Sequence, residues 1–562
     1  RQILEHSGMY DRNLLNIFVQ IKDLQFITAI REGEAIPNRL LNKFNVIAIG
    51  QPADSQLRRI YNSILNYNFS DFDAEEVKSE IEHCVNFLIT TFKAISSSED
   101  LISSPSKPHY LFSLKDISRI IKGVSIIPKA NCDSKTIFLK LFYHEQQRVY
   151  QDKMILKSDL VLMKQILDSS FNSEFESKIT DLLGESIEPP IFSSVLYEET
   201  GYQIISDKEN ESSIDQLKKI FEESLKQYNL EKKKGLNIVL FSEAITQAIK
   251  ICRGIIIDEG NLLLIGDGGT GRTSLTKLSA FLTKTIVFEI KTKNVNSFRT
   301  QIKQIFETIV FKPNSFVLLI KENDVKNQDV MEEINSLLSS GEIPNLFIKK
   351  EGKDEFSKIR DKFRNDGHKE SDEMLYENFV KFIKNKMHIV FCIARLGDNL
   401  RQMTRNYSGI VYGTSQIVFD TWNKSALVQI AKWFLNPLEE NIETSIFQKL
   451  PDYFANTHHE INEVAIKMNL KCDQNINLTP KTFIDFGKCF KNILDKKNDE
   501  ISKNIYKYEN GLNKLAETRE NVEQLKISMD VKRVELHKKK KECEEMLFKI
   551  DNEKRESAKE KK

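Results

Sequence analysis

The chain has 562 residues, a mass of 65.2 kDa and a net charge of +1. This length exceeds one hydrophobic core, since domains average roughly 150 residues, so three or four units are expected. The balanced charge excludes a global field for nucleic acid or an anionic membrane, and the longest apolar runs are far shorter than the ~20 residues of a membrane span. The seven cysteines lack CxxC pairs, which argues against a zinc site or a disulfide framework and favours a reducing, intracellular setting.

The first third of the chain is predicted to be a short mixed segment followed by a helical subdomain. Residues 1–66 mix short strands and helices. Residues 67–190 are mainly helical, because apolar side chains recur there at three- and four-residue spacing, as in Ile81–Ile95, Ile117–Val124 and Ile137–Tyr150.

From residue 191 strands alternate with helices, which predicts a parallel sheet covered on both faces. Helices are expected over Ile214–Tyr228, Phe241–Ile251, from Thr273, and again over Ala426–Leu470. The expected strands are Asn261–Ile265, Thr285–Ile290, Phe316–Ile320 and His388–Ile393. The predicted class is α/β, and the second half of the chain repeats the α/β-then-helical plan of the first.

A seven-residue repeat begins after Pro480 and predicts one long helix. One row is apolar throughout: Ile501, Tyr508, Leu515, Val522, Met529, Leu536, Cys543 and Ile550. The companion row is apolar only at its ends and basic in its middle: Ile505, Leu512, Arg519, Lys526, Arg533, Lys540 and Leu547. A helix face with one apolar row and one half-apolar row is expected to pack against one partner helix, and the register between the two helices need not be exact. The helix would extend ~120 Å at 1.5 Å per residue, and its partner is expected outside this chain.

A glycine loop follows the strand that ends at Ile265 and matches GxxxxGK[ST], with arginine in the lysine position. Its residues are the candidate nucleotide-binding set: Gly266, Asp267, Gly268, Gly269, Thr270, Gly271, Arg272, Thr273 and Ser274. Glycines let backbone N–H groups face a phosphate chain, the helix N-terminus adds partial positive charge, and Thr273 can offer its hydroxyl to magnesium. Arginine stays cationic and can contact phosphate, but its planar guanidinium is larger than the lysine ammonium and would position the γ-phosphate differently. Nucleotide binding is therefore expected more strongly than hydrolysis. The alternative is a glycine-rich turn between a strand and a helix.

The candidate Walker B strand is Phe316–Ile320, followed by Lys321, Glu322 and Asn323. Glu322 falls where the acid that organises magnesium is expected, and Asn323 falls where a catalytic glutamate would stand. Asparagine can orient a water but cannot accept its proton, so hydrolysis is not expected here. A buried strand that ends in surface acids is the alternative reading.

These motifs resemble dynein heavy chains over essentially the whole length. EEINSLLSSGEIPNLF (Glu332–Phe347) is similar to the family's stretch after Walker B almost residue for residue, and it is the most specific string. GDGGTGRTSLTKL resembles the loop of the fourth AAA+ module, and HIVFCIARLGDNLRQMTR (His388–Arg405) resembles its sensor strand and arginine-bearing segment. HYLFSLKD (His109–Asp116) and HEQQRVYQD (His144–Asp152) look like the sensor II and lid segments of the third module, and ENGLNKLAETRENVEQL (Glu509–Leu525) looks like the outgoing stalk helix.

The resemblance implies AAA+ P-loop modules followed by a long coiled-coil helix, with the chain divided in a definite order. The implied parts are the end of the third module's α/β domain at 1–66, its helical lid at 67–190, the fourth module's α/β P-loop domain at 191–437, the fourth lid at 438–480 and the first stalk helix at 481–562.

The same resemblance implies ATP or ADP with Mg²⁺ at the fourth module. The backbone at Val239 and Leu240 would border the adenine, and Thr273 and Glu322 would hold the metal. The sensor position is Ala394 and one family arginine is replaced by Met403, so a degenerate, regulatory site is implied. Lys115 stands at the arginine position of the third module's sensor II segment.

In the family this segment belongs to an ATP-hydrolysing microtubule motor, and the lid strings are closer to those of axonemal dyneins than to those of the cytoplasmic form. The implied partners are the remaining AAA+ modules and return stalk helix of the same heavy chain, a microtubule through the stalk tip, and dynein intermediate and light chains, without DNA or membrane. The implied location is the cytoplasmic cytoskeleton and the ciliary axoneme. Two alternatives remain open: a spacer module with an empty loop, and an SMC-like coiled-coil ATPase acting on DNA.

Overall fold

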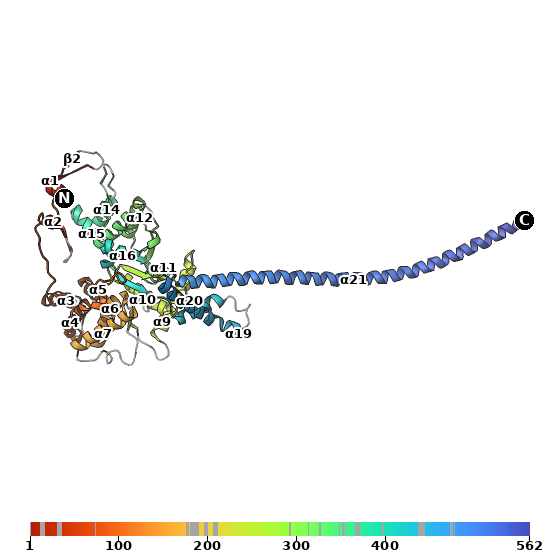
Figure 1. Ribbon diagram of the computed structural model, residues 1–562, viewed down its shortest axis with the longest axis horizontal. Helices are drawn as coiled ribbons and strands as arrows, with labels where there is room; N and C mark the ends of the chain where they lie inside the picture. Colours follow the sequence, from red (N-terminus) through yellow and green to blue (C-terminus); the bar gives the residue numbers. More distant parts are fainter. Residues whose placement is uncertain are drawn as a thin grey trace. The chain divides into compact units, whose positions relative to one another are not determined.

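The computed structural model describes residues 2–11, 17–30, 36–72, 75–175, 179, 190–195, 201–205, 212–291, 294–312, 314–324, 327–347, 349–350, 353–354, 356–365, 371–395, 398–436, 444–472, 476 and 478–561. The chain divides into two compact units, residues 1–90 and residues 91–562. Figure 1 gives the order of the elements.

The first unit mixes short strands and helices, as predicted for residues 1–66. Strands β1 (Gly8–Tyr10) and β2 (Phe18–Gln20) pair antiparallel. The helices are α1 (Gln2–His6), α2 (Asn38–Leu41), α3 (Asp54–Asn68) and the first part of α4 (Glu75–Ser97). Among the described residues of this unit β1 and β2 are the only strands, so the expected repetition of the α/β plan is limited there to one antiparallel pair.

The second unit opens with an upstream helical domain. Its elements after α4 are η1 (Glu99–Leu101), α5 (Leu114–Val124), η2 (Lys129–Asn131), α6 (Lys135–Tyr150), η3 (Gln151–Lys153) and α7 (Lys157–Glu174). The three predicted helical stretches lie in α4, α5 and α6, which confirms them. Helix α5 begins with a capping box, because the Asp116 carboxylate accepts a hydrogen bond from the backbone N–H of Ser113 at 3.0 Å.

The α/β domain follows as a five-stranded, all-parallel sheet in the order β11-β5-β10-β7-β6. Its strands are β5 (Leu262–Gly266), β6 (Ile286–Glu289), β7 (Phe316–Lys321), β10 (Met387–Ile393) and β11 (Ser415–Phe419). The first four match the predicted strands. Strand β11 was not predicted, although it lies directly beside the loop strand β5.

Helices cover both faces of this sheet. They are α9 (Ser213–Glu231), α10 (Ser242–Ile256), α11 (Arg272–Leu282), α12 (Val295–Phe311), α13 (Gln328–Ser340), α14 (Ser357–Asn365), α15 (Asp372–Lys386), α16 (Asp398–Asn406) and α17 (Ser408–Tyr412), with η4 (Glu322–Asp324) after β7. Two short antiparallel pairs accompany the sheet: β3 (Ile191–Ser193) with β4 (Gln203–Ile205), and β8 (Lys349–Lys350) with β9 (Lys353–Asp354).

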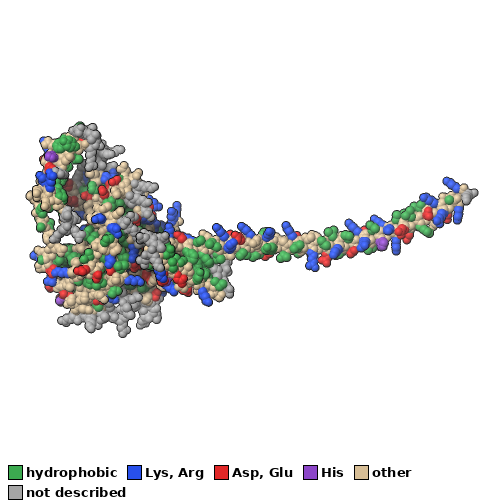
Figure 2. All heavy atoms as spheres, viewed as in Figure 1, with side chains coloured by type: hydrophobic (Ala, Val, Ile, Leu, Met, Phe, Trp, Pro, Cys, Tyr) green, Lys and Arg blue, Asp and Glu red, His purple; other side chains and the backbone are tan. Residues whose placement is uncertain are grey.

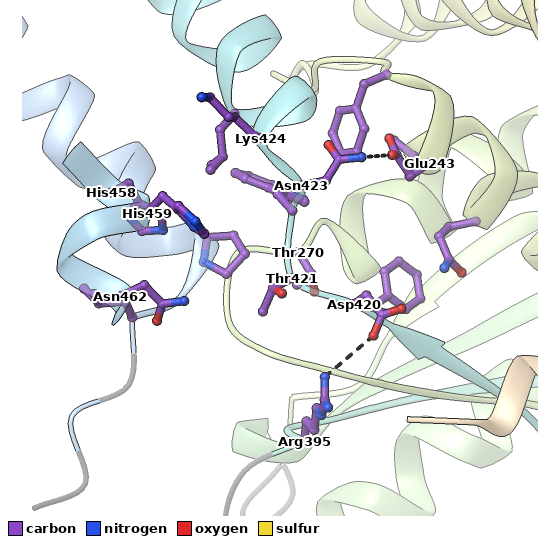
Figure 3. Close-up of a pocket in the computed structure, with 18 of the residues that line it drawn as sticks. Glu243, Thr270, Arg395, Asp420, Thr421, Asn423, Lys424, His458, His459 and Asn462 are labelled. Carbon is purple, nitrogen blue, oxygen red and sulfur yellow. Dashed lines mark hydrogen bonds and ion pairs between the residues drawn. The ribbon is translucent and has the colours of Figure 1, made fainter. Parts of the chain in front are cut away.

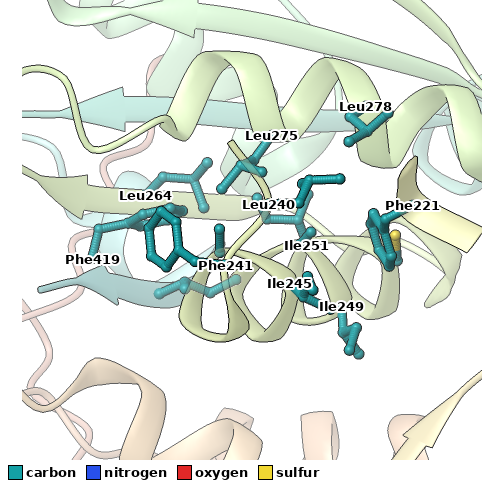
Figure 4. Packing of buried hydrophobic residues seen from close by; sticks show 14 of the residues in the cluster. Phe221, Leu240, Phe241, Ile245, Ile249, Ile251, Leu264, Leu275, Leu278 and Phe419 are labelled. Atoms are coloured by element: carbon teal, nitrogen blue, oxygen red, sulfur yellow. The ribbon is translucent and has the colours of Figure 1, made fainter. Parts of the chain in front are cut away.

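The two faces of the sheet carry separate apolar cores. On one face α10 and α11 pack against alternate residues of the strands, including Leu264 of β5 and Phe419 of the edge strand β11. Figure 4 shows this side, with Leu240, Phe241 and Leu275 between the helices and the sheet. The other face packs against α12, α13 and α15. Burial of both faces explains why strands β5, β7 and β10 read as continuous apolar runs.

A buried ion pair joins the upstream helical domain to the α/β domain. The Arg253 guanidinium of α10 donates to both carboxylate oxygens of Glu145 in α6, with Nε at 3.1 and 3.0 Å. The Tyr202 hydroxyl donates to the same carboxylate at 2.8 Å. All three side chains are buried. A Cβ added at Gly123 would lie 1.8 Å from a Glu145 oxygen, so α5 must present a glycine here.

The downstream helices are α18 (Lys424–Leu435), α19 (Thr444–Phe447), α20 (Leu450–Cys472) and α21 (Pro480–Glu560). The first turns of α21 are anchored by aromatic contacts, with Phe483 5.9 Å from Phe434 and Phe486 4.7 Å from Phe454 between ring centroids. Beyond them α21 continues as one uninterrupted helix (Figure 1), and apolar and basic side chains are exposed along it in Figure 2.

The predicted class is confirmed: a parallel α/β P-loop domain, helical domains and a long C-terminal helix. The predicted long helix from Pro480 runs for 81 residues, and its apolar heptad row is exposed throughout. None of the described helices combines the length and the apolar character needed to cross a membrane.

Candidate functional site

The glycine loop lies between the buried strand β5 and helix α11, the order that the motif requires. Gly269 and Gly271 have φ angles of +91° and +92°, in the left-handed region that favours glycine. The loop is closed at Thr270, whose hydroxyl donates to the carbonyl oxygen of Asp267 at 2.8 Å. Gly271 is the N-cap of α11, so the N–H groups of Arg272, Thr273 and Ser274 form its first turn. These N–H groups are the donors that a phosphate would use.

Arg272 is bonded within the domain. Its guanidinium donates to the carbonyl oxygen of Ile393 at the end of β10, and at 3.2 Å to the carbonyl oxygen of Asp267 in the loop. A lysine has no planar fork and could not bridge these two carbonyls in the same way. The arginine therefore ties the loop to β10 and still brings a positive charge to the mouth of the loop.

The two predicted metal ligands lie on either side of strand β10: Thr273 is in the first turn of α11, which follows the loop after β5, and Glu322 follows β7. The Glu322 Oε2 accepts a hydrogen bond from the backbone N–H of Ala394, just after β10, at 2.8 Å. The Thr273 hydroxyl is in hydrogen-bond contact with Cys392, whose pKa burial raises to about 11. The side chain of Asn323 lies outside what the structure describes.

These residues fit a magnesium ion that accompanies a nucleotide. In the part of the chain that the structure describes, no three His, Cys, Asp or Glu side chains are grouped to hold a metal by themselves. Magnesium at nucleotide sites is held through one or two protein oxygens and the phosphates, with waters completing the octahedron. The Thr273 hydroxyl and the Glu322 carboxylate would supply those protein oxygens.

A cavity of about 710 Å³ opens beside the loop (Figure 3). Its walls come from α10, from the end of β11, from the downstream helices, from Thr270 of the loop and from the end of the upstream helical domain. Phe241 and Trp422 form an apolar corner, with ring centroids 6.0 Å apart at an interplanar angle of 80°. Arg395 and Asp420, which also line the cavity, approach to 3.7 Å and are joined by a dashed line in Figure 3. An apolar corner beside charged groups suits a base joined to phosphates.

The segment predicted to border the adenine lies next to this cavity. Leu240 is buried in the core of Figure 4 and Val239 packs at its edge, while the adjacent Phe241 lines the cavity wall. The structure therefore brings this segment, Thr270 and the first turn of α11 to the same side of the sheet.

Helix α21 begins against the glycine loop. The backbone N–H of Lys481 donates to the carbonyl oxygen of Gly268 at 3.2 Å, and Pro480 lines the cavity. A Cβ added at Gly269 would lie 2.4 Å from the Lys481 nitrogen. The loop and the first turn of the long helix are thus in direct backbone contact.

Several cavity residues were missed by the sequence analysis. Arg395, Asp420, Trp422 and Asn423 follow β10 and β11, where side chains at the carboxyl ends of parallel strands gather at one edge. The short apolar run at the end of Ser415–Phe419 was the only available signal for β11 and for the polar residues after it.

Comparisons with known proteins agree with this geometry. Residues 236–493 match the family described as P-loop containing dynein motor region D4, and residues 89–186 match the AAA+ lid domain. Dynein axonemal heavy chain 2 of Homo sapiens is 30% identical over 528 residues, which is 93% of this chain and 12% of that protein. The Dynein-1-beta heavy chain of the flagellar inner arm I1 complex of Chlamydomonas reinhardtii is 29% identical over 92% of this chain and 11% of that protein.

The chain thus spans about an eighth of the length of the curated relatives that it matches. The D4 match covers the sheet, the glycine loop, the downstream helices and the start of α21, and the lid match covers the upstream helical domain. With axonemal heavy chains matching along nearly its whole length, the chain belongs to the dynein heavy chain family.

Proposed function

We propose that this chain is a segment of the motor ring of an axonemal dynein, in which the D4 loop holds an adenine nucleotide as a structural or regulatory ligand. The motor as a whole hydrolyses ATP and moves along microtubules in the cilium. This segment binds nucleotide, connects neighbouring modules and starts the stalk.

The support for binding without turnover is the set of bonds that the loop residues make. Arg272 holds the loop to β10, and the Glu322 carboxylate accepts from the Ala394 N–H, so both side chains already have partners within the domain. The residue after Glu322 is Asn323, which cannot accept a proton from water. A loop built in this way can retain phosphate without activating a nucleophile.

Bound Mg²⁺ would neutralise phosphate charge, with Thr273 and Glu322 as its protein ligands. The first-turn N–H groups of α11 would bind phosphate oxygens, and the corner of Phe241 and Trp422 would receive the base. Lys481, bonded to Gly268, would place the first turn of α21 beside the nucleotide. Nucleotide would therefore stabilise the packing between the loop and the start of the stalk helix.

The stalk proposal rests on the exposed heptad row of α21. A return helix of the same heavy chain would cover this row, and the basic middle of the companion row would leave the register adjustable. The tip beyond the helix would bind the microtubule. The other AAA+ modules of the heavy chain, with intermediate and light chains, would complete the assembly.

A second candidate is a spacer module whose loop stays empty. The same observation favours it, since Arg272 and Glu322 already have partners within the protein. No observation on the described residues supports an SMC-like ATPase that acts on DNA. Binding of the chain to DNA at moderate salt would be needed to support that function.

Equilibrium titration of the full chain with ATP and ADP, with and without Mg²⁺, separates these candidates. Trp422 in the cavity is an intrinsic reporter if Trp433 is replaced by Phe. Nucleotide binding that strengthens with Mg²⁺, and a Thr273→Ala variant that loses this strengthening, would support the proposed site. No change of Trp422 fluorescence and no heat of binding at millimolar nucleotide would support the spacer.

A further inference from the structure

Part of the cavity wall comes from the upstream helical domain. We call residues 151–157 the strap: η3, then Met154, Ile155 and Leu156, then Lys157, the first residue of α7. The last three residues of the strap line the cavity together with Thr270 and Asp420. Strap element η3 packs against the edge strand β11. A ligand in the cavity would therefore meet a piece of the preceding helical domain.

Buried charged groups fasten the strap to helix α5. The Lys153 ammonium is 3.1 Å from the Asp116 carboxylate, and both side chains are at most 3% exposed. Asp116 also accepts from Arg119 at 2.8 Å, and from the backbone N–H of Ser113 at the start of α5. The carbonyl oxygen of Lys153 accepts from the His109 ring at 2.9 Å. Movement of Lys153 would therefore alter the hydrogen bonds of Asp116 in the first turn of α5.

The end of the strap is held from the same side. The Tyr110 hydroxyl accepts from the backbone N–H of Ile155 at 2.8 Å and donates to Asp159 at 2.9 Å. Asp159 is also paired with Lys107 at 2.7 Å. The strap is thus bonded at two points to the segment just before α5, and it cannot shift alone.

The strap is also bonded to the α/β domain. The Asp152 carboxylate is 2.8 Å from the Lys250 ammonium of α10. Glu243 in the first turn of α10 lines the cavity, and so does Phe241, the residue just before this helix. The cations around the cavity are Lys157, Arg395 and Lys424, and the acids are Glu243 and Asp420. Lys157 is the cation that the upstream helical domain contributes.

We propose that the strap is a nucleotide-sensing wall: Lys157 contacts a nucleoside di- or triphosphate held in the cavity, and the Asp116–Lys153 pair passes the position of the strap to α5. This inference rests on the proposed nucleotide site. It adds a binding residue from the neighbouring module and a route from the site to that module.

The binding residue is tested in the full chain by calorimetric titration with Mg-ADP and Mg-ATP. Lys157→Ala should weaken binding about 5- to 20-fold, because the contact is charge-assisted but Lys157 is exposed to solvent, which reduces its contribution. Lys164→Ala, an exposed lysine further along α7, is the matched control and should bind as the wild type does. Equal affinities for the wild type and Lys157→Ala would overturn this assignment.

The route is tested by backbone hydrogen exchange with and without Mg-ADP. In the wild type, nucleotide should slow exchange several-fold in the strap and in the first turns of α5. In Asp116→Asn, which keeps a hydrogen-bonding side chain at the start of α5, the strap should still respond while α5 does not. Binding with no response in the wild-type strap overturns the proposal while leaving the nucleotide site intact. Absence of any nucleotide binding by the wild type overturns the site and the inference together.

Discussion

At the scale of single residues, two neighbouring glycines of the loop have different surroundings. Gly269 has a left-handed backbone and faces the backbone of Lys481, whereas a Cβ at Gly268 would meet nothing within 4 Å. The identity of the residue therefore matters at one position and hardly at the other, although both belong to the same motif.

Gly269→Ala should lower the free energy of unfolding by about 1–3 kcal/mol, because a side chain strains the left-handed backbone and pushes on the first turn of α21. Gly268→Ala is the matched control and should stay within about 0.5 kcal/mol of the wild type. Thermal unfolding without nucleotide measures both. Equal stabilities of the two variants would mean that the start of α21 does not rest on the loop.

His109 predicts a pH dependence of stability. Burial lowers its pKa from 6.5 to about 4. Above pH 6.5 the ring is neutral in both the folded and the unfolded chain. Between pH 6.5 and 4 only the unfolded chain binds a proton at this ring. As the pH is lowered through this range, His109 therefore decreases the free energy of unfolding by up to about 1.4 kcal/mol per pH unit. His144 and His388, whose pKa values burial also lowers, act in the same direction.

Denaturant unfolding at several pH values between 7.5 and 4.5 should therefore show a shallower slope for His109→Gln than for the wild type. His537→Gln, on the exposed part of α21, should keep the wild-type slope. Identical slopes for His109→Gln and the wild type would show that the ring does not stay neutral in the folded chain.

At the scale of elements, the helices and strands with a strong pattern of apolar residues could be predicted from the sequence. Strands β5, β7 and β10 are continuous apolar runs because both faces of the sheet are covered, and α5 and α6 show helical spacing. Strand β11 was missed because Ser415–Phe419 is short and begins with two polar residues. The destination of the Arg272 guanidinium could not be read from the motif, because the partner is a backbone carbonyl of β10, 121 residues away.

The joint between α6 and α10 is predicted to depend on its buried ion pair. Arg253→Met leaves the Glu145 carboxylate buried beside Tyr202 alone, and it should cost about 3–5 kcal/mol of unfolding free energy. Lys122→Met breaks the ion pair between Lys122 and Glu259, in which both side chains are nearly half exposed. This substitution should lower the free energy of unfolding by under about 1 kcal/mol. Chemical denaturation gives both values, and a small loss for Arg253→Met would contradict the joint.

Helix α21 should show two regimes of stability along its length. Phe483 and Gly487 are buried against the downstream helices, whereas the heptad row from Ile501 onward is exposed. Backbone hydrogen exchange should therefore be slow near residue 485 and fast beyond residue 500, since an unpartnered helix is only marginally stable. Uniformly slow exchange would show instead that the row is already covered by a partner.

At the scale of the whole molecule, the second unit gathers distant segments around one cavity. Residues near positions 156, 241, 270, 420 and 480 all line it. No single motif predicts this convergence, because it depends on how the upstream helical domain, the sheet and the downstream helices pack. The sequence could place the loop and its strand, but not the strap or the residues after β11.

We propose that the D4 loop retains ATP without hydrolysing it. The most direct measurement is a single-turnover assay with the full chain in excess over labelled ATP and Mg²⁺, in which bound nucleotide is recovered and its ATP and ADP content determined. We expect that ATP is retained and remains intact over the time in which an active AAA+ site would complete many turnovers. Stoichiometric conversion of the bound ATP to ADP, or failure to retain any nucleotide, would contradict it.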